Sequence, residues 1–336
     1  MRAIIAAVFG MFALISVEAA AKDTINIYSH RQPFLIQPFI DAYQAKNDVT
    51  INVIFAKRGL AQRLQAEGRN SPADLVLTVD IARIHQFADG GLLQPVRSAI
   101  LDANIPANLR ADDNTWFGLS RRARVIVVSK SATDMADLKD YEDLAQPQWQ
   151  GRLCSRPGGH VYNRALLGSL IHHLGQAGAK DWARSFVGNL ARKPQGNDRA
   201  QVKAIWSGEC DVGIINSYYF GKLLTADIPE HRAWADSVRM IFPNQSNRGT
   251  HVNISGGGIA RHAKNVAAAV KFLEWLVSNE GQLLYQKVNY EFPINPAAET
   301  TGMIASWGTF KADDLALEKL PPLTQQAQKI IDATGW

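Results

Sequence analysis

Two adjacent tyrosines, Tyr218 and Tyr219, are the residues of this sequence with the clearest potential for chemistry. They follow the apolar run 212–215, which has the composition of a buried strand. Neighbouring residues of a strand point to opposite faces, so a continuing strand would separate the two phenols. At a strand end that turns into a loop or a helix, both hydroxyls can reach one point. Two phenolate oxygens there would suit a hard cation such as Fe(III); the alternative is aromatic packing at a cleft or a core edge.

A third phenol, Tyr162, follows Gly158 and Gly159 in a turn that runs into a predicted helix over residues 165–174. Helix N-termini and glycine turns attract anions, so Tyr162 could reach a cleft beside a small anion; the alternative is an ordinary tyrosine at a helix start. Three phenolates would neutralise a trivalent cation. Because a free phenol has a pKa near ~10, the charge of the ion must drive deprotonation, and binding should weaken in acid.

The first part of the chain alternates strand and helix patterns. Strands are predicted over residues 24–29, 49–55 and 73–78, with helices over 37–46 and 60–67 between them. This order predicts a parallel sheet covered by helices. Ligands in such sheets bind beyond the carboxyl ends of the strands, where His30, Arg31 and Asp80 would meet. His30 is therefore a candidate metal ligand, the alternative being a structural histidine.

A second α/β set follows the long apolar run 116–129, which is suited to passing between domains. Further strands are predicted over 151–154, 211–215, 238–242 and 251–259, and further helices over 165–174, 181–191, 200–207, 263–278 and 321–334. The last two strands are expected to return to the first domain. The pattern predicts an α/β protein of two lobes, each a mixed, mostly parallel sheet flanked by helices, with a ligand cleft between the lobes.

This organisation divides the chain into four parts. Residues 1–21 are predicted to be a signal peptide, with Arg2 before an apolar stretch and small residues for cleavage. Residues 22–121 and 250–300 would form a discontinuous N-terminal lobe, and 122–249 the C-terminal lobe. Residues 301–336 would form helices packed on the lobes. An exported bacterial protein of this kind is expected in the periplasm, as a monomer.

Composition and motifs argue against two other classes of protein. The formal net charge is +5, and the densest basic cluster is only Arg121, Arg122 and Arg124, so no nucleic-acid partner is expected. No nucleophile elbow, zinc-protease motif, P-loop or dinucleotide fingerprint is present, so an enzyme is not expected.

Cys154 and Cys210 are the only cysteines. An oxidising compartment favours a disulfide between them, although two buried free thiols remain open as an alternative. Cys154 precedes Tyr162 by eight residues, and Cys210 precedes Tyr218 by eight. A bridge would therefore brace the two segments that carry these phenols.

These motifs together resemble the periplasmic ferric-iron-binding proteins of bacterial ABC importers, which have the class II periplasmic binding fold. The resemblance covers nearly all of the chain after the signal and is carried by five segments: residues 27–34, 73–80, 116–125, 248–256 and 288–293, in addition to the tyrosine motifs.

The resemblance implies that Tyr162, Tyr218 and Tyr219 bind the iron. Gln32 and Pro33 stand where some relatives carry a His-Tyr pair, and His30 stands where others carry a tyrosine, so His30 is expected as the ligand from the N-terminal lobe. If His30 does not bind, water or an anion such as carbonate would complete the coordination. Arg31 or Arg122 would hold that anion or neutralise a phenolate, the alternative being a salt bridge across the hinge.

The resemblance further implies a non-catalytic protein that delivers Fe(III) to a membrane permease with a cytoplasmic ATPase. The nearest alternative is the same scaffold binding a sugar, polyamine, thiamine or oxyanion in an aromatic cleft. A more distant alternative is an exported enzyme that uses a tyrosinate base.

Overall fold

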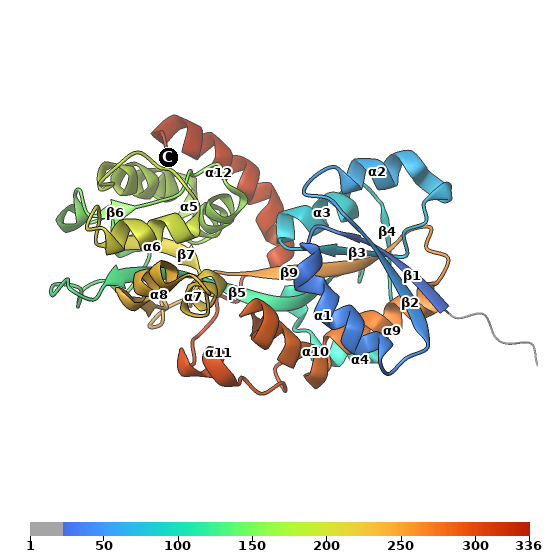
Figure 1. Cartoon of the computed structure of the whole chain (residues 1–336). Helices are drawn as coiled ribbons and strands as arrows, with labels where there is room; N and C mark the ends of the chain where they lie inside the picture. The colour runs from blue at the N-terminus through green and yellow to red at the C-terminus, as the bar shows by residue number, and fades with distance from the viewer. Residues whose placement is uncertain (1–22) are drawn as a thin grey trace, which may run out of the picture.

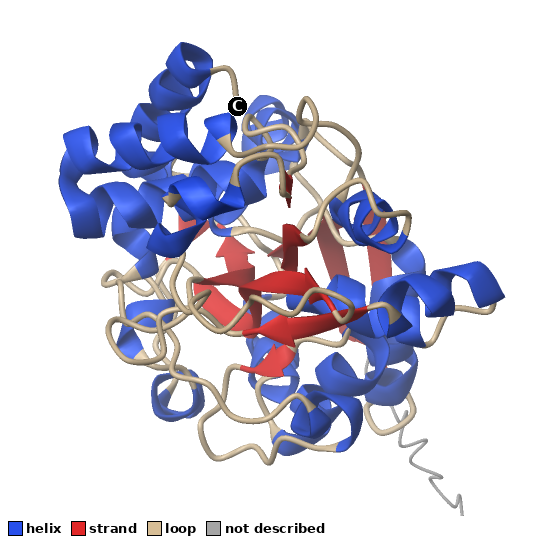
Figure 2. Ribbon diagram, turned by 90° about the vertical axis from the view of Figure 1, so that its left-hand side faces the viewer, coloured by secondary structure: helices blue, strands red, loops and turns tan. Residues whose placement is uncertain are grey.

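The computed structural model describes residues 23–336, so the predicted signal peptide over 1–21 lies outside the described residues. The described chain forms two lobes, with β5 and β9 running between them (Figure 1). In the view turned by 90°, the strands lie at the centre and helices flank them (Figure 2). The two-lobed fold predicted from the sequence is confirmed, whereas the exact residue boundaries of the lobes stay a prediction.

Among residues 23–336, ten strands form one sheet that continues from the N-terminal into the C-terminal lobe. The main path runs, in order, through β2 (Val49–Phe55), β1 (Asp23–Ser29), β3 (Leu75–Thr78), β9 (Val252–Ala260), β5 (Phe117–Ser129), β7 (Val212–Asn216) and β6 (Leu153–Cys154). The short strand β4 (Leu93–Gln94) pairs with β9, and both β8 (Val238–Ile241) and β10 (Phe292–Pro293) pair with β5.

Strand β5 belongs to both lobes. Its first half pairs with β9 in the N-terminal lobe, and its second half pairs with β7 and β8 in the C-terminal lobe. In the second half, Ile126 and Val128 join one hydrophobic cluster, and Val125 and Val127 join another. Because successive side chains of a strand point to opposite faces, one strand supplies both cores of the C-terminal lobe.

The prediction that the sheet of each lobe is mostly parallel is wrong. Parallel pairing joins β1 to β2, β1 to β3, and β6 to β7, whereas every pairing of β5 and β9 is antiparallel. These two long strands are antiparallel because β5 carries the chain from the N-terminal into the C-terminal lobe and β9 carries it back. The predicted return of residues 238–242 to the first lobe is also wrong, because β8 pairs with the far end of β5, Val238 opposite Ser129.

Helices cover both lobes. The N-terminal lobe carries α1 (Pro33–Gln44), α2 (Leu60–Glu67), α3 (Ile81–Asp89), α4 (Ala99–Asn104), α9 (Val266–Leu276) and α10 (Asn279–Leu284). The C-terminal lobe carries α5 (Val161–Gly188), α6 (Asp198–Trp206), α7 (Ser217–Leu224) and α8 (Pro229–Asp236), and α11 (Gly302–Ser306) and α12 (Leu320–Thr334) follow. Gly175 adopts φ 72° and interrupts α5, which agrees with the two helices predicted there. Within residues 23–336, no helix has the length and apolar character of a membrane span.

Trp336 forms hydrogen bonds with the turn that precedes Tyr162. Helix α12 packs on α5 through a shared hydrophobic cluster. Beyond α12, the Trp336 indole nitrogen donates to the Ser155 hydroxyl at 2.9 Å, and its carbonyl accepts from Gly158 N at 3.1 Å. A Cβ on Gly158 would lie 2.7 Å from the Trp336 ring, so only glycine allows this approach.

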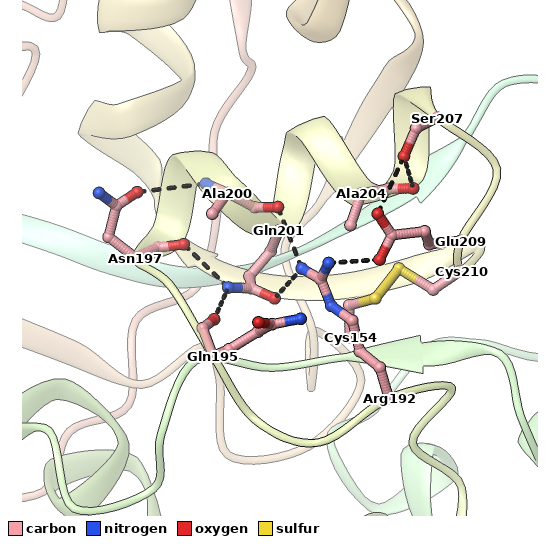
Figure 3. Close-up of a disulfide and its surroundings, with 10 residues drawn as sticks. All are labelled: Cys154, Arg192, Gln195, Asn197, Ala200, Gln201, Ala204, Ser207, Glu209 and Cys210. Atoms are coloured by element: carbon pink, nitrogen blue, oxygen red, sulfur yellow. Dashed lines mark hydrogen bonds and ion pairs between the residues drawn. A yellow bond between two sulfur atoms is a disulfide. The ribbon is translucent and has the colours of Figure 1, made fainter.

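The disulfide predicted from the sequence is confirmed between Cys154 and Cys210 (Figure 3). Cys154 ends β6 opposite Gly213 of β7, and Cys210 lies just before β7. From Cys154 the chain continues to Tyr162, and from Cys210 it continues through β7 to Tyr218. The disulfide therefore joins the starts of the two segments that carry Tyr162 and Tyr218.

Replacing both cysteines by alanine should lower the free energy of unfolding by about 4 kcal/mol, because the bridge closes a chain segment of 56 residues. Chemical denaturation of the two proteins measures the difference. Reductant should destabilise the wild type to the same level and leave the double variant unchanged. Equal stability of both oxidised proteins would contradict a structural role for the bridge.

Candidate functional site

A cavity of about 540 Å³ lies between the lobes, and every metal ligand predicted from the sequence lines it. The C-terminal lobe contributes Tyr162, Tyr218, Tyr219, Arg199 and Lys222, and the N-terminal side contributes His30, Arg31 and Glu291. Arg122, on the shared strand β5, also lines the cavity.

Tyr218 and Tyr219 lie in the first turn of α7, immediately after β7 ends at Asn216. A continuing strand would have sent the two phenols to opposite faces. The change from strand to helix instead places their ring centroids 4.3 Å apart. The strand end that the sequence predicted at this position is therefore confirmed.

Tyr162 lies in the first turn of α5, after the N-capping residue His160, whose Nδ1 accepts from Tyr162 N at 3.3 Å. Its hydroxyl oxygen is 3.0 Å from the hydroxyl oxygen of Tyr218. Burial raises the pKa of both phenols, so each is protonated at neutral pH before any cation arrives. Two phenol oxygens that share one hydrogen bond are placed to bind one cation after losing their protons.

Positive side chains surround these phenols. The guanidinium of Arg156 lies 5.2 Å from the centroid of the Tyr162 ring, and that of Arg122 lies 5.9 Å from the centroid of the Tyr218 ring. The Lys222 ammonium lies 5.5 Å from the Tyr218 centroid, and burial lowers the pKa of this lysine to about 8. These cations would stabilise phenolates, because each negative oxygen would form close to positive charge.

The carboxylate of Asp198 forms ion pairs with two arginines, Arg124 and Arg156. Its carboxylate accepts from Arg124 at 2.6 Å and from Arg156 at 2.8 Å, and all three side chains are buried. Burial alone would raise the pKa of Asp198, but the two guanidinium groups lower it, so the carboxylate is ionised. Because one carboxylate is shared by two arginines, net positive charge remains next to the Tyr162 ring.

Glu291 has the corresponding position on the other side of the cavity. It pairs with Arg31 at 3.1 Å and with Arg122 at 3.9 Å, and it also accepts hydrogen bonds from Ser120 and Ser255. Burial alone would raise the pKa of Glu291, but the two arginines hold it at about 2. The salt bridge considered as an alternative for Arg31 and Arg122 is therefore present, and both arginines still line the cavity.

His30 is a neutral imidazole, and one of its two ring nitrogens is already hydrogen-bonded. Its Nδ1 lies 2.7 Å from the Ala56 carbonyl, which can only accept, so Nδ1 carries the proton. Burial lowers the pKa of the ring. The Nε2 lone pair is left for another partner, which is the arrangement of metal-binding histidines that donate through their second nitrogen. No hydrogen bond among the described residues joins His30 to the tyrosines.

The described residues offer no second cluster of common metal-binding side chains. Within residues 23–336, no group of three or more His, Cys, Asp or Glu side chains is placed to hold a metal ion. His173 lies 2.8 Å from Asp313. The phenol cluster is therefore the strongest candidate for a metal centre in this part of the chain.

The chain matches a family model described as bacterial extracellular solute-binding protein over residues 28–283. The chain belongs to this family. Iron uptake protein A1 of Synechocystis sp. is 42% identical to this solute-binding protein over 316 residues, which are 94% of this chain and 88% of that protein.

Solved structures give the same result. The Trichodesmium protein IdiA (FutA) in complex with iron and citrate ligands has a TM-score of 0.90 and 43% identity, covering 93% of this chain and 99% of that one. Ferric iron-binding protein A of Mannheimia haemolytica, in an open conformation, has a TM-score of 0.87 and 42% identity, covering 93% and 98%. These relatives confirm the resemblance to ferric-iron-binding proteins that the sequence indicated.

Sequence reasoning missed part of the charge network in this solute-binding protein. Asp198, Arg156 and Lys222 were not singled out, and Glu291 was noted only within a segment of resemblance. The available signals were generic: Asp198 opens a helix, and Glu291 is a lone acid before Phe292 and Pro293. Only the fold places these charges beside the phenols. The ligand roles of Tyr162, Tyr218, Tyr219 and His30 stay predictions.

Replacing Glu291 by glutamine should remove part of the acid sensitivity of the fold. The folded-state pKa of about 2 lies below the ~4.3 of an unfolded glutamate, so the carboxylate stabilises the fold above about pH 4.3. That contribution is lost as the pH falls toward 2. At pH 7 the variant should be roughly 3–5 kcal/mol less stable, because two buried arginines lose their shared partner.

Denaturation curves between pH 2 and 7 measure this effect. Asp181→Asn, which removes an exposed carboxylate paired with Arg184, is the control and should follow the wild type throughout. If Glu291→Gln lost stability in parallel with the wild type as the pH falls, the carboxylate would not be the titrating group.

Proposed function

We propose that this protein binds Fe(III) in the interlobe cleft through the phenolates of Tyr162, Tyr218 and Tyr219 and delivers it to an ABC importer. The observation that carries the proposal is the 3.0 Å separation of the Tyr162 and Tyr218 hydroxyl oxygens, with the Tyr219 ring beside them. Phenolates are hard, anionic oxygen donors, and Fe(III) is a hard trivalent cation. The high similarity to proteins named for iron uptake and ferric iron binding supports the same cargo.

His30 is proposed as the ligand from the N-terminal lobe. Its protonated Nδ1 donates a hydrogen bond to the Ala56 carbonyl, which leaves the Nε2 lone pair for the metal. Arg31 and Arg122 are proposed to neutralise phenolate charge or to hold a synergistic anion such as carbonate. Their shared partner Glu291 supplies one negative charge for two guanidinium groups, so positive charge remains for an anion.

The remaining proposals concern the cellular role. Residues 1–21 would direct export to the periplasm, where the protein would act as a monomeric binding protein rather than an enzyme. It would pass Fe(III) to an inner-membrane permease driven by a cytoplasmic ATPase. Closure of the lobes would be favoured only as far as Fe(III) binds the closed state more tightly than the open state.

Titration of the metal-stripped protein with Fe(III) citrate should produce a visible phenolate-to-iron charge-transfer band that saturates near one equivalent. Tyr218→Phe keeps the ring but removes the oxygen, so the band should be lost or strongly weakened. Tyr43→Phe is the matched control, because this tyrosine is buried in the N-terminal core and should not affect the band. A folded wild type without any band would refute iron binding by tyrosine.

His30→Ala tests the ligand from the N-terminal lobe in the same titration. If Nε2 binds iron, the band should shift in wavelength, and competition with a chelator should show weaker binding. An unchanged spectrum with unchanged affinity would assign His30 a structural role.

Iron affinity should fall steeply as the pH falls. Burial raises the pKa of Tyr162 and Tyr218, so both phenols must release a proton to bind Fe(III). Each displaced proton lowers the affinity about tenfold per pH unit, which predicts a slope of at least about two in the logarithm of the binding constant. Chelator competition between pH 5.5 and 8, corrected for protonation of the chelator, measures the slope. A slope near zero would contradict binding through these phenols.

A further inference from the structure

Tyr290 lines the interlobe cavity of about 540 Å³, which we refer to as the tyrosine cleft. Its backbone is left-handed, with φ 56° and ψ 34°. Among residues 23–336, the other non-glycine residues with positive φ are Asn114 and Asn244, and asparagine tolerates this conformation better than an aromatic residue does. A bulky residue keeps such a backbone only where the surrounding structure holds it there.

The backbone at Tyr290 is anchored in the N-terminal lobe. Residues Tyr285–Asn289 form a π-helical turn after α10, a rare structure that is frequent at functional sites. Tyr285 is buried in the hydrophobic cluster of the N-terminal lobe, with its ring centroid 4.6 Å from that of Phe39 in α1. The Glu291 N–H donates to the Tyr285 carbonyl at 3.2 Å, which closes the turn around Tyr290.

The side chain of Tyr290 packs on the C-terminal lobe instead. It contacts the hydrophobic cluster that contains Leu223 of α7. A Cβ on Gly221 would lie 2.7 Å from Cγ of the Tyr290 ring, so only glycine lets the ring lie directly on the backbone of α7. The Thr225 hydroxyl donates to the Gly221 carbonyl at 3.0 Å. The Tyr290 hydroxyl, 2.8 Å from Thr225 Oγ1, is therefore the donor in the hydrogen bond between these two side chains.

Helix α7 is the helix whose first turn carries Tyr218 and Tyr219. Contacts with Gly221 and with Thr225 at its C-terminal end fix the direction of this short helix, and hence the direction in which its first turn presents the two phenols. A left-handed residue at a helix end is most often glycine. A tyrosine is less favourable for the backbone there, and its ring contacts with α7 offset that cost.

We propose that Tyr290 is a positioning residue that clamps α7 to the N-terminal lobe and thereby keeps Tyr218 and Tyr219 in the orientation that binds iron. The iron-binding part rests on the proposed function. Because the backbone of Tyr290 belongs to one lobe and its ring to the other, a movement of the N-terminal lobe is transmitted to α7. The next residue, Glu291, pairs with Arg31 and Arg122, so the charge network and the phenol helix are joined to the same segment.

Hydrogen exchange of the metal-free protein tests the clamp. Tyr290→Gly retains the left-handed backbone but removes the ring, so the amides of α7 should exchange at least about tenfold faster than in the wild type, with those of α9 unchanged. Asn114→Gly is the matched control, because it makes the same replacement at φ 58° in the turn before β5 and should leave α7 unchanged.

Tyr290→Phe loses only the hydroxyl and should accelerate exchange of α7 about threefold, so it decides the question if the glycine variant does not fold. Unchanged exchange of α7 in the folded Tyr290 variants would overturn the proposal. Faster exchange throughout the molecule would also overturn it, because the ring would then contribute only to global stability.

Iron binding tests the consequence for the phenols. In the Fe(III) citrate titration, Tyr290→Gly should shift the charge-transfer band, and chelator competition should show binding at least about tenfold weaker, whereas Asn114→Gly should match the wild type. A merely structural role would lower the melting temperature without moving the band. Tyr290→Phe should weaken binding about threefold in the wild type and have no further effect in Thr225→Val, because both changes remove the same hydrogen bond.

An unchanged band and affinity in a Tyr290→Gly protein whose α7 exchanges faster would overturn the positioning role, as would equal weakening in Asn114→Gly. Absence of the band in the wild type would instead refute the proposed function. Hydrogen exchange would still decide whether Tyr290 clamps α7, because that measurement uses the metal-free protein.

Discussion

Positive charge buried beside the phenols is the constraint on which the rest of the site depends. Burial alone keeps Tyr162 and Tyr218 protonated, so nearby positive charge is needed to make phenolates accessible. Buried guanidinium groups are themselves unstable without partners. The fold meets both requirements by sharing one carboxylate between two arginines, once at Asp198 and once at Glu291. Each arrangement stabilises its arginines and leaves net positive charge facing the cleft.

Strand β5 connects this charge network to the architecture of the molecule. Arg122 and Arg124 are two residues apart and therefore point to the same face, at the place where the pairing of β5 changes from β9 to β7. The neighbouring Arg121 pairs with Phe292 of β10, which follows Glu291 directly. The charges that support the phenols thus lie on the strand that joins the lobes. Any bending of that strand on closure would act on the site itself.

The two interlobe cavities differ in how their charge is balanced. In the tyrosine cleft, the Glu291 carboxylate and three phenol oxygens lie among the cations, so the cleft is suited to a metal that the phenolates would bind. The second cavity, of about 400 Å³, is lined by Lys57, Arg58, Arg83 and Arg164 and by no aspartate or glutamate. His30 borders both cavities.

The sequence by itself determined the local features: the parallel strands β1 to β3, the strand end before Tyr218, the turn before Tyr162, and the pairing of Cys154 with Cys210. The strands, the strand end and the turn depend on short-range patterns of apolar residues and glycines, whereas the disulfide was predicted from the presence of only two cysteines and an oxidising compartment. The resemblance to ferric-iron-binding proteins also rested on such short segments.

Only the tertiary structure decided the antiparallel course of β5 and β9, the place of β8, and the partners of the buried charges. Asp198 and Arg124 are far apart in sequence, as are Glu291 and Arg31, and many other charged residues have equally suitable types. Which of them meet depends on how the two lobes pack around β5. That packing is governed by non-directional burial of apolar surface, which leaves no local signal of the charge pairs that it brings together.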